Sequence, residues 1–289
     1  MWYYITVICN IFVILYIFFN LGEYMQENRD NTIFIKETLI NNNILVLTLN
    51  SPKSGNTLSL NTLNYLIAKL NNISSDKNIR VIVFSSSGKI FCAGHDLKEI
   101  IKNDNNDYYN ELFQKCSELM LKITSLPQPV IAEIDGYASA AGCQLVATCD
   151  LAIASKNSFF STPGIKIGLF CSTPMVALTR AINPKKSMQM LLTGESIKSK
   201  EAMEIGLIND VVEKEKLRDS VIKLATKITN LPRGVLELGK KTFYSQYNLT
   251  LNDAYRLTSQ VMVENLSKKD SKEGINAFIQ KREANWTDD

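Results

Sequence analysis

Two turns rich in small residues are the segments of this chain whose backbone groups are best suited to chemistry. They are residues 91–98 (FCAGHDLK) and 135–144 (DGYASAAGCQ). Each follows an apolar run typical of a buried strand and has Gly or Ala where a loop becomes a helix. The first N–H groups of a helix are unpaired donors, and small side chains let a ligand approach them. Two such turns facing each other would hold one oxygen of an enolate or tetrahedral intermediate, as an oxyanion hole does. Tight helix–strand packing is the alternative explanation for either turn alone.

The composition excludes several classes of site. His95 is the only histidine among 289 residues, so a multi-histidine zinc site is excluded and any Ser-His-Asp or Cys-His arrangement depends on it. The glycine patterns of phosphate-binding loops and nucleophile elbows do not occur. A net charge of +3 gives no support for a nucleic-acid partner. The six cysteines form no Cys-x-x-Cys pair, and we expect buried free thiols instead of metal ligands or disulfides.

The N-terminal stretch Trp2–Leu21 carries no charge and is long enough to cross a bilayer as a helix. It lacks the basic start and the small-residue cleavage site of a secretory signal. A retained membrane anchor, a cleaved signal segment and an incorrectly assigned start remain alternatives. We therefore treat residues 1–30 as a targeting or anchor segment plus connector, with membrane association, if any, through residues 2–21.

Strand and helix patterns alternate through residues 31–197, which predicts an α/β core. The apolar runs that predict strands are 33–35, 44–49, 81–84, 130–132 and 151–154. Amphipathic stripes predict helices over 60–73, 112–123 and 140–148. From residue 198 to 289 the pattern predicts an all-helical region. Its predicted helices are 200–205, 215–228, 233–247, 251–265 (with Thr250 and Asp253 as a capping box) and 275–282.

From Ile44 to Asp289 the chain resembles the crotonase (enoyl-CoA hydratase/isomerase) superfamily. Within it, the motifs are most similar to those of the branch called enoyl-CoA hydratase domain-containing protein 3. The resemblance implies a spiral of ββα units followed by helices. It rests on landmarks in the same order at 56–58, 91–99, 130–150, 162–164, 168–174, 191–195, 202–209 and 278–286.

The resemblance also implies roles for individual residues. The two oxyanion-hole donors fall on the backbone N–H groups of His95 and Ala141. Coenzyme A, as part of the substrate thioester and not as a bound cofactor, would be held by a first turn and by two C-terminal residues from a neighbouring element. No metal is expected. The coenzyme A-binding positions are Ala93, His95, Asp96, Leu97, Lys98, Phe278 and Lys281, although Lys98 is also consistent with an ordinary exposed lysine.

The sequence departs from the family at its catalytic acids. The two glutamates of ordinary hydratases correspond here to Gln144 and Gly164, and the acid of the dienoyl isomerases corresponds to Lys166. Each member of an acid–base pair contributes about 10²- to 10⁴-fold to the rate. We therefore expect hydration to be lost while the electrostatic part of the site is retained. Restoring a glutamate at Gly164 is expected to meet either a positive φ or a clash in the following loop.

Three further side chains near the expected acyl pocket carry possible chemistry. An unperturbed imidazole titrates near neutrality, so His95 could act as a base, or its ring could be anchored by Asp96 or by a backbone carbonyl. Cys171 and Ser172 are expected to rim the pocket, but no neighbouring base supports a nucleophilic role for either.

These observations favour an acyl-CoA thioester-binding protein of fatty-acid metabolism that stabilises a thioester enolate. Decarboxylation of a malonyl-type thioester and double-bond isomerisation are reactions that need no strong base. The alternatives are a non-catalytic acyl-CoA-binding or scaffold protein, and an active hydratase or isomerase that uses another acid or base such as His95. By resemblance we expect a homotrimer or hexamer in the mitochondrion. The hydrophobic segment keeps a membrane-anchored or secretory-derived location open.

Overall fold

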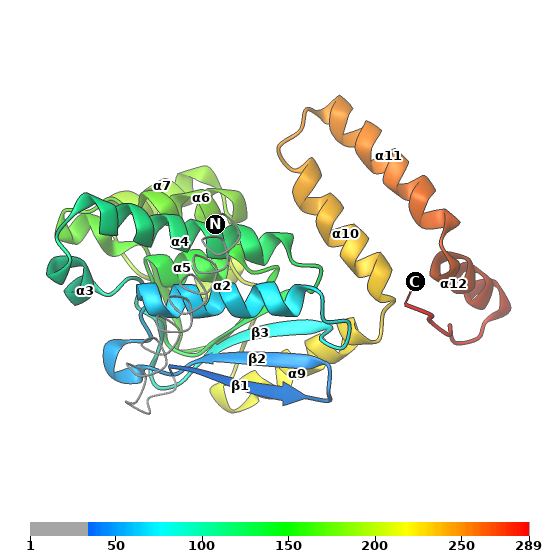
Figure 1. Cartoon of the computed structure of the whole chain (residues 1–289), viewed down its shortest axis with the longest axis horizontal. Coiled ribbons are helices and arrows are strands. Elements are labelled where there is room, and N and C mark those ends of the chain that lie inside the picture. The colour runs from blue at the N-terminus through cyan, green and yellow to red at the C-terminus, as the bar shows by residue number, and fades with distance from the viewer. Residues whose placement is uncertain (1–33, 289) are drawn as a thin grey trace, which may run out of the picture. The chain divides into compact units, whose positions relative to one another are not determined.

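The computed structural model describes residues 34–288, so the stretch 2–21 lies outside the described residues. The larger of its two sheets consists of five mutually parallel strands and one antiparallel edge strand, which a hairpin joins to its neighbour. The edge strand and the next two strands of this sheet are labelled in Figure 1. Residues 41–43 form the hairpin loop, in which Asn41 and Asn42 have φ values of 51° and 58° and the Asn43 N–H donates to the Ile40 carbonyl at 3.2 Å, as in a turn with two left-handed central residues. In spatial order the strands are β1 (Ile35–Ile40), β2 (Ile44–Leu49), β3 (Val81–Ser86), β5 (Val130–Ile134), β7 (Leu151–Ser155) and β10 (Asp210–Val212).

After three of these strands, β3, β5 and β7, the chain continues into a short strand of a second, smaller sheet. In spatial order it contains β4 (Ile90–Cys92), β6 (Tyr137–Ser139), β8 (Phe159–Ser161) and β9 (Ile197–Lys198), the last being antiparallel. The order long strand, short strand, helix therefore recurs, which confirms the predicted spiral of ββα units. The helical segments of this part are η2 (Pro52–Ser54), α2 (Leu60–Ser74), α3 (Leu97–Lys102), α4 (Asn106–Ser125), α5 (Ala141–Thr148), η3 (Pro163–Ile167), α6 (Ser172–Ala181), α7 (Pro184–Thr193) and α8 (Ser199–Glu204).

The central strands of the larger sheet are buried on both faces, which explains their continuous apolar runs. In β3, Ile82 and Phe84 belong to a core that also contains residues of α2, α4 and α5. The alternate residues Val81 and Val83 pack with Leu217, Val221 and Ala225 of α9 (Lys214–Thr229). Helix α9 therefore covers the second face of the sheet and belongs to the same packing unit.

The chain becomes purely helical later than the sequence predicts, because β10 follows residue 198 and pairs with β7. After α9 come α10 (Arg233–Gln246), α11 (Leu251–Ser267) and α12 (Lys269–Gln280) (Figure 1). Thr250 caps α11 by accepting a hydrogen bond from the Asp253 N–H at 3.2 Å, as predicted. Neither α10 nor α11 contains a buried residue.

One buried polar cluster attaches α10 to the α/β part. The Lys240 ammonium donates to Asp150 Oδ2 at 2.7 Å and to the carbonyls of Ile123 and Gln128, each at 2.9 Å. One helical turn later, Tyr244 donates to Asp150 Oδ1 at 2.8 Å. All three lysine protons have acceptors, which offsets the cost of burying the charge.

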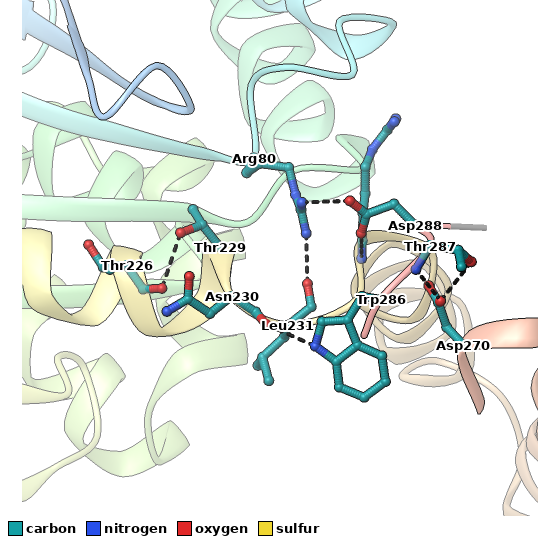
Figure 2. A network of polar contacts seen from close by, with 10 residues as sticks. Arg80, Thr226, Thr229, Asn230, Leu231, Asp270, Trp286, Thr287 and Asp288 are labelled. Atoms are coloured by element: carbon teal, nitrogen blue, oxygen red, sulfur yellow. Dashed lines mark hydrogen bonds and ion pairs between the residues drawn. The ribbon is translucent and has the colours of Figure 1, made fainter. Parts of the chain in front are cut away.

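The C-terminal residues fold back onto the start of α10 (Figure 2). Asp288 accepts from Arg80 at 3.0 Å and from the Arg233 N–H at 2.8 Å, while Arg80 also donates to the Leu231 carbonyl at 2.7 Å. Trp286 donates to the Asn230 carbonyl at 3.1 Å. These contacts tie the end of the chain to the segment between α9 and α10.

The cysteines within the described residues are free thiols, as predicted. In the same part of the chain no helix is both long enough and apolar enough to cross a membrane.

Candidate functional site

The first turn is held by the segment that precedes α2. Asn56 is buried, and its amide donates to the carbonyls of Ser87 and Ile90 at 2.8 and 2.6 Å. Next to it, the Ala93 N–H donates to the Gly55 carbonyl at 2.9 Å and the Leu58 N–H donates to the Gly94 carbonyl at 2.8 Å. The turn at 93–95 is thus fixed by backbone hydrogen bonds to residues 55–58, from which α2, β3 and β4 separate it in the chain.

The second turn leads directly into α5 and contains a strained residue. Ala140 has φ 49° and ψ −117°, a backbone conformation that costs about 1–3 kcal/mol for a residue other than glycine. Gly142 allows α5 to approach β4, since a methyl group there would lie 2.1 Å from the Cys92 carbonyl oxygen. Strain and close approach together set where the first N–H group of α5 lies.

The two turns are in contact. A methyl group on Gly94 would lie 3.2 Å from the Ala141 nitrogen and 3.0 Å from the Ala140 side chain. Within residues 34–288, neither the His95 N–H nor the Ala141 N–H donates to a protein acceptor. Two unpaired backbone donors therefore come from adjacent turns. That both bind the same oxygen atom of a ligand stays a prediction.

Both turns line a cavity of about 830 Å³, within the usual size range of small-molecule sites. It brings together most of the predicted site residues, including Gly164 from η3 and both Cys171 and Ser172 at the start of α6. Predicted positions on its wall are Ala93, His95, Asp96, Leu97, Lys98 and Ala141.

The charged side chains of this wall are mostly cationic. Lys53, Lys98 and Lys166 line the cavity, and none of them has an ion-pair partner among the described residues. Asp96 is the only carboxylate in the lining of the described part. Its Oδ1 caps α3 by accepting from the N–H groups of Lys98 at 2.9 Å and Glu99 at 3.3 Å. The wall can attract an anion but offers no uncommitted carboxylate base.

The imidazole of His95 is anchored by a backbone carbonyl and not by Asp96. Its Nδ1 lies 3.0 Å from the Leu58 carbonyl oxygen, and its ring meets Phe113 edge-on at 5.4 Å. Burial lowers the pKa of His95 and outweighs the opposite effect of the Leu58 hydrogen bond. The neutral form is therefore favoured near pH 7.

The two positions without acids differ in their surroundings. Gln144 is buried away from the cavity lining, and its Oε1 lies 3.8 Å from the Cys116 sulfur. Gly164 does line the cavity, and its φ is not positive, so of the two expected obstacles to a glutamate there the positive φ was wrong. The obstacle is space, because a methyl group would lie 2.5 Å from the Leu169 carbonyl oxygen and 2.9 Å from the Cys171 sulfur. Burial also raises the pKa of the Cys171 thiol, which disfavours a thiolate nucleophile.

Phe278 and Lys281 do not line this cavity within the chain. Phe278 lies on α12 with 85% of its surface exposed, and Lys281 follows that helix with φ 54°. Lys53 and Phe113 also line the cavity, although no sequence pattern had selected either residue for the site. The only signal was the landmark at 56–58, whose asparagine positions the neighbouring segment.

Comparisons with known proteins assign the chain to a family. The sequence profile of the enoyl-CoA hydratase/isomerase family matches residues 39–289. Enoyl-CoA hydratase domain-containing protein 3, mitochondrial, from Xenopus laevis is 48% identical over 239 residues, covering 83% of this chain and 81% of the relative. Its Homo sapiens counterpart is 47% identical over 241 residues, covering 83% and 80%.

Solved structures give the same result. The human enoyl-CoA hydratase domain-containing protein 3 superposes with a TM-score of 0.85 at 46% identity, covering 88% of this chain and 100% of that one. An enoyl-CoA hydratase from Mycobacterium smegmatis superposes with a TM-score of 0.86 at 40% identity, covering 88% and 98%. The profile match across most of the chain and these identities show that the chain belongs to the enoyl-CoA hydratase/isomerase family.

Proposed function

We propose that this protein binds an acyl-CoA thioester and stabilises its enolate between the backbone N–H groups of His95 and Ala141. The observation that carries the proposal is the pair of unpaired donors in adjacent turns on one cavity wall. Preorganised N–H groups of this kind act on charge that develops on an oxygen, without a titratable side chain. Family membership supports a coenzyme A thioester as the source of that oxygen.

Coenzyme A enters this proposal as part of the substrate and not as a resident cofactor. Its phosphates are matched by Lys53 and Lys98, whose ammonium groups have no ion-pair partner among residues 34–288. The Lys98→Ala variant should weaken acyl-CoA binding about tenfold, the size of one charge-assisted contact. Lys102→Ala, on the same helix but outside the cavity lining, is the matched control and should bind like the wild type.

We further propose that ordinary hydration is lost. The cavity wall of the described part has a single carboxylate, Asp96, and it caps α3. Decarboxylation of a malonyl-type thioester fits this wall without a carboxylate base: the C–C bond breaks, carbon dioxide leaves and the electron pair of that bond passes into the enolate. A proton from water then adds to the α-carbon and gives the acyl thioester. Double-bond isomerisation assisted by a polar side chain is the other reaction that fits.

The test is turnover and binding with one panel of enoyl-, β-hydroxyacyl- and malonyl-type CoA thioesters. Thermal stabilisation by the thioesters with turnover of a malonyl-type or enoyl member, and without hydration, supports the proposal. Stabilisation without any turnover would favour the alternative of a non-catalytic acyl-CoA-binding or scaffold protein. Rapid hydration would favour a hydratase that uses another acid or base, and no stabilisation at all would reject a coenzyme A site.

We also propose assembly into a homotrimer or a hexamer through the C-terminal helices. Apolar side chains there are exposed within one chain, among them Leu251 at 75%, Val263 at 71%, Phe278 at 85% and Ile279 at 70%. A neighbouring copy is then the route by which Phe278 and Lys281 reach a coenzyme A site. Light scattering at micromolar concentration should give three or six times the mass of one chain, and a clean monomer would reject the assembly.

The location we propose is the mitochondrion, because the names of the Xenopus laevis and Homo sapiens relatives include that organelle. Cell fractionation should recover the protein with mitochondrial markers. Recovery of the full-length protein in the cytosol would contradict the proposal.

A further inference from the structure

Two hydrogen bonds connect His95 to Leu58, one from its side chain and one from the peptide group that precedes it; we call the side-chain bond the imidazole–Leu58 tie. The Leu58 N–H donates to the Gly94 carbonyl at 2.8 Å, and the Leu58 carbonyl lies 3.0 Å from His95 Nδ1. A carbonyl oxygen only accepts, so Nδ1 must carry the proton of this hydrogen bond. The contact therefore selects the neutral tautomer in which Nε2 holds a lone pair.

The first of these bonds controls the direction of the His95 N–H. The Gly94 carbonyl and the His95 N–H belong to one planar trans peptide, so they point in opposite directions. When Leu58 holds the carbonyl, the N–H must point away from Leu58. Gly94 has φ 96° and no side chain, so its backbone needs such external ties to keep one conformation.

The other ring nitrogen is poorly placed to exchange protons. His95 Nε2 has less than 1 Å² of accessible surface and no hydrogen-bond partner among the described residues. Phe113 packs edge-on against the ring at 5.4 Å. An imidazolium would therefore carry a second N–H that is buried without an acceptor, which disfavours protonation.

We propose that the imidazole of His95 is a positioning residue, which acts through Leu58 to aim the backbone N–H of the same residue at the thioester oxygen. The function of that N–H rests on the proposed function above, whereas the imidazole–Leu58 tie is independent of it. The competing role is proton transfer at Nε2, and the two roles need different atoms of the ring.

The tie itself can be measured in the wild-type protein, because an untagged chain contains a single histidine. Its ¹⁵N spectrum should show a protonated Nδ1 and an unprotonated Nε2 at pH 7. A protonated Nε2, or an imidazolium at that pH, would overturn the proposal whatever the ligand is.

Three variants then separate positioning from proton transfer. In His95→Asn the amide nitrogen takes the place of Nδ1 and retains a donor to Leu58, whereas His95→Gln reaches toward the Nε2 position and His95→Ala retains neither. The readout is the ¹³C shift of the thioester carbonyl in bound [1-¹³C]crotonyl-CoA, which reports polarisation of that bond. We expect Asn to keep most of the wild-type shift and both Ala and Gln to fall to about half, because one of two donors is misaligned.

Each other outcome has a defined meaning. Equal losses in Asn and Ala would overturn the positioning role. The rate of whichever thioester the wild type turns over is also followed against pH. If the same rise or fall of that rate with pH disappears in all three variants, proton transfer is assigned to Nε2 instead. If the wild type binds crotonyl-CoA without any carbonyl shift, the proposed function fails, while the ¹⁵N measurement still decides the Leu58 tie.

Discussion

The two turns of the site and the C-terminal helices are held in opposite ways. The turns are fixed by backbone hydrogen bonds and by glycines that leave no room for a methyl group, as Gly94 and Gly142 do. Helices α10 and α11 bury no residue, and α10 is attached through the polar cluster around Lys240. The comparison indicates that one chain suffices to shape the two turns, whereas the C-terminal helices present surface that another molecule can cover.

The largest expected effect comes from breaking the attachment of α10. Lys240→Met preserves the length of the side chain but leaves the partly buried Asp150 carboxylate without its cation. We expect the free energy of unfolding to fall by about 3 kcal/mol, near the lower end for a broken buried pair, because Tyr244 and the Val130 N–H still donate to Asp150. Urea denaturation measures this, with the exposed neighbour Lys241→Met as control. Equal effects of the two changes would contradict the role of the cluster.

Within the site, Gly142→Ala tests the close approach of α5 to β4. The added methyl would lie 2.1 Å from a backbone oxygen, so the start of α5 must move. Overpacking of this kind costs about 1–3 kcal/mol. We expect lower stability in denaturation and weaker acyl-CoA binding in calorimetry, since Ala141 would shift with the helix. A variant with wild-type stability and affinity would show that the turn is not rigid.

A pH-dependent effect should distinguish the site from the helices. Because burial lowers the pKa of His95 in the folded state, the unfolded chain binds more protons as the pH falls through about 6.5. The contribution of His95 to stability is therefore complete above that pH and is lost as the pH falls toward the lower, folded-state pKa. Denaturation at several pH values should show a steeper acid loss in the wild type than in His95→Asn. If stability fell with pH in the same way in the wild type and in His95→Asn, this would contradict a buried neutral imidazole.

The smallest effect is expected at a glycine in the C-terminal part. Gly239 lies inside α10, and a methyl group there would have no atom within 4 Å. Gly239→Ala should raise stability by about 0.5–1 kcal/mol through helix propensity alone. Thermal denaturation and light scattering check this together. Lower stability combined with a smaller mass would mean that a second copy packs against this position.

The sequence predicted the four central strands of the larger sheet, β2, β3, β5 and β7, because they are buried on both faces and read as unbroken apolar runs. The short edge strand β10 was not predicted. The sequence did not predict β4, β6 and β8 either, because three residues are too few to display a period. The first strand was expected at 33–35 but is Ile35–Ile40, since this edge strand is largely exposed and carries polar residues. The local pattern thus identified the central strands of the larger sheet and the helices packed on them. It did not identify the short strands of the second sheet, which lie between them in the chain.

For the site, the sequence identified both turns but not the contacts that fix them. The partner of His95 was left open between Asp96 and a carbonyl, and the structure gives the carbonyl of Leu58, which is 37 residues away. Lys53 and Phe113 reach the cavity from other segments. Such tertiary contacts leave no local signal in the residues themselves.

The most direct test of the central claim uses the wild-type protein and one ligand. [1-¹³C]Crotonyl-CoA is added to saturation, and both the thioester carbonyl shift and the formation of 3-hydroxybutyryl-CoA are followed. We predict saturable binding with a polarised carbonyl and negligible hydration, because the proposed site supplies two backbone donors, and Gln144 and Gly164 stand in place of the two glutamates. Hydration at rates typical of enzymes, about 1–10³ s⁻¹, or binding without any carbonyl shift, would contradict it.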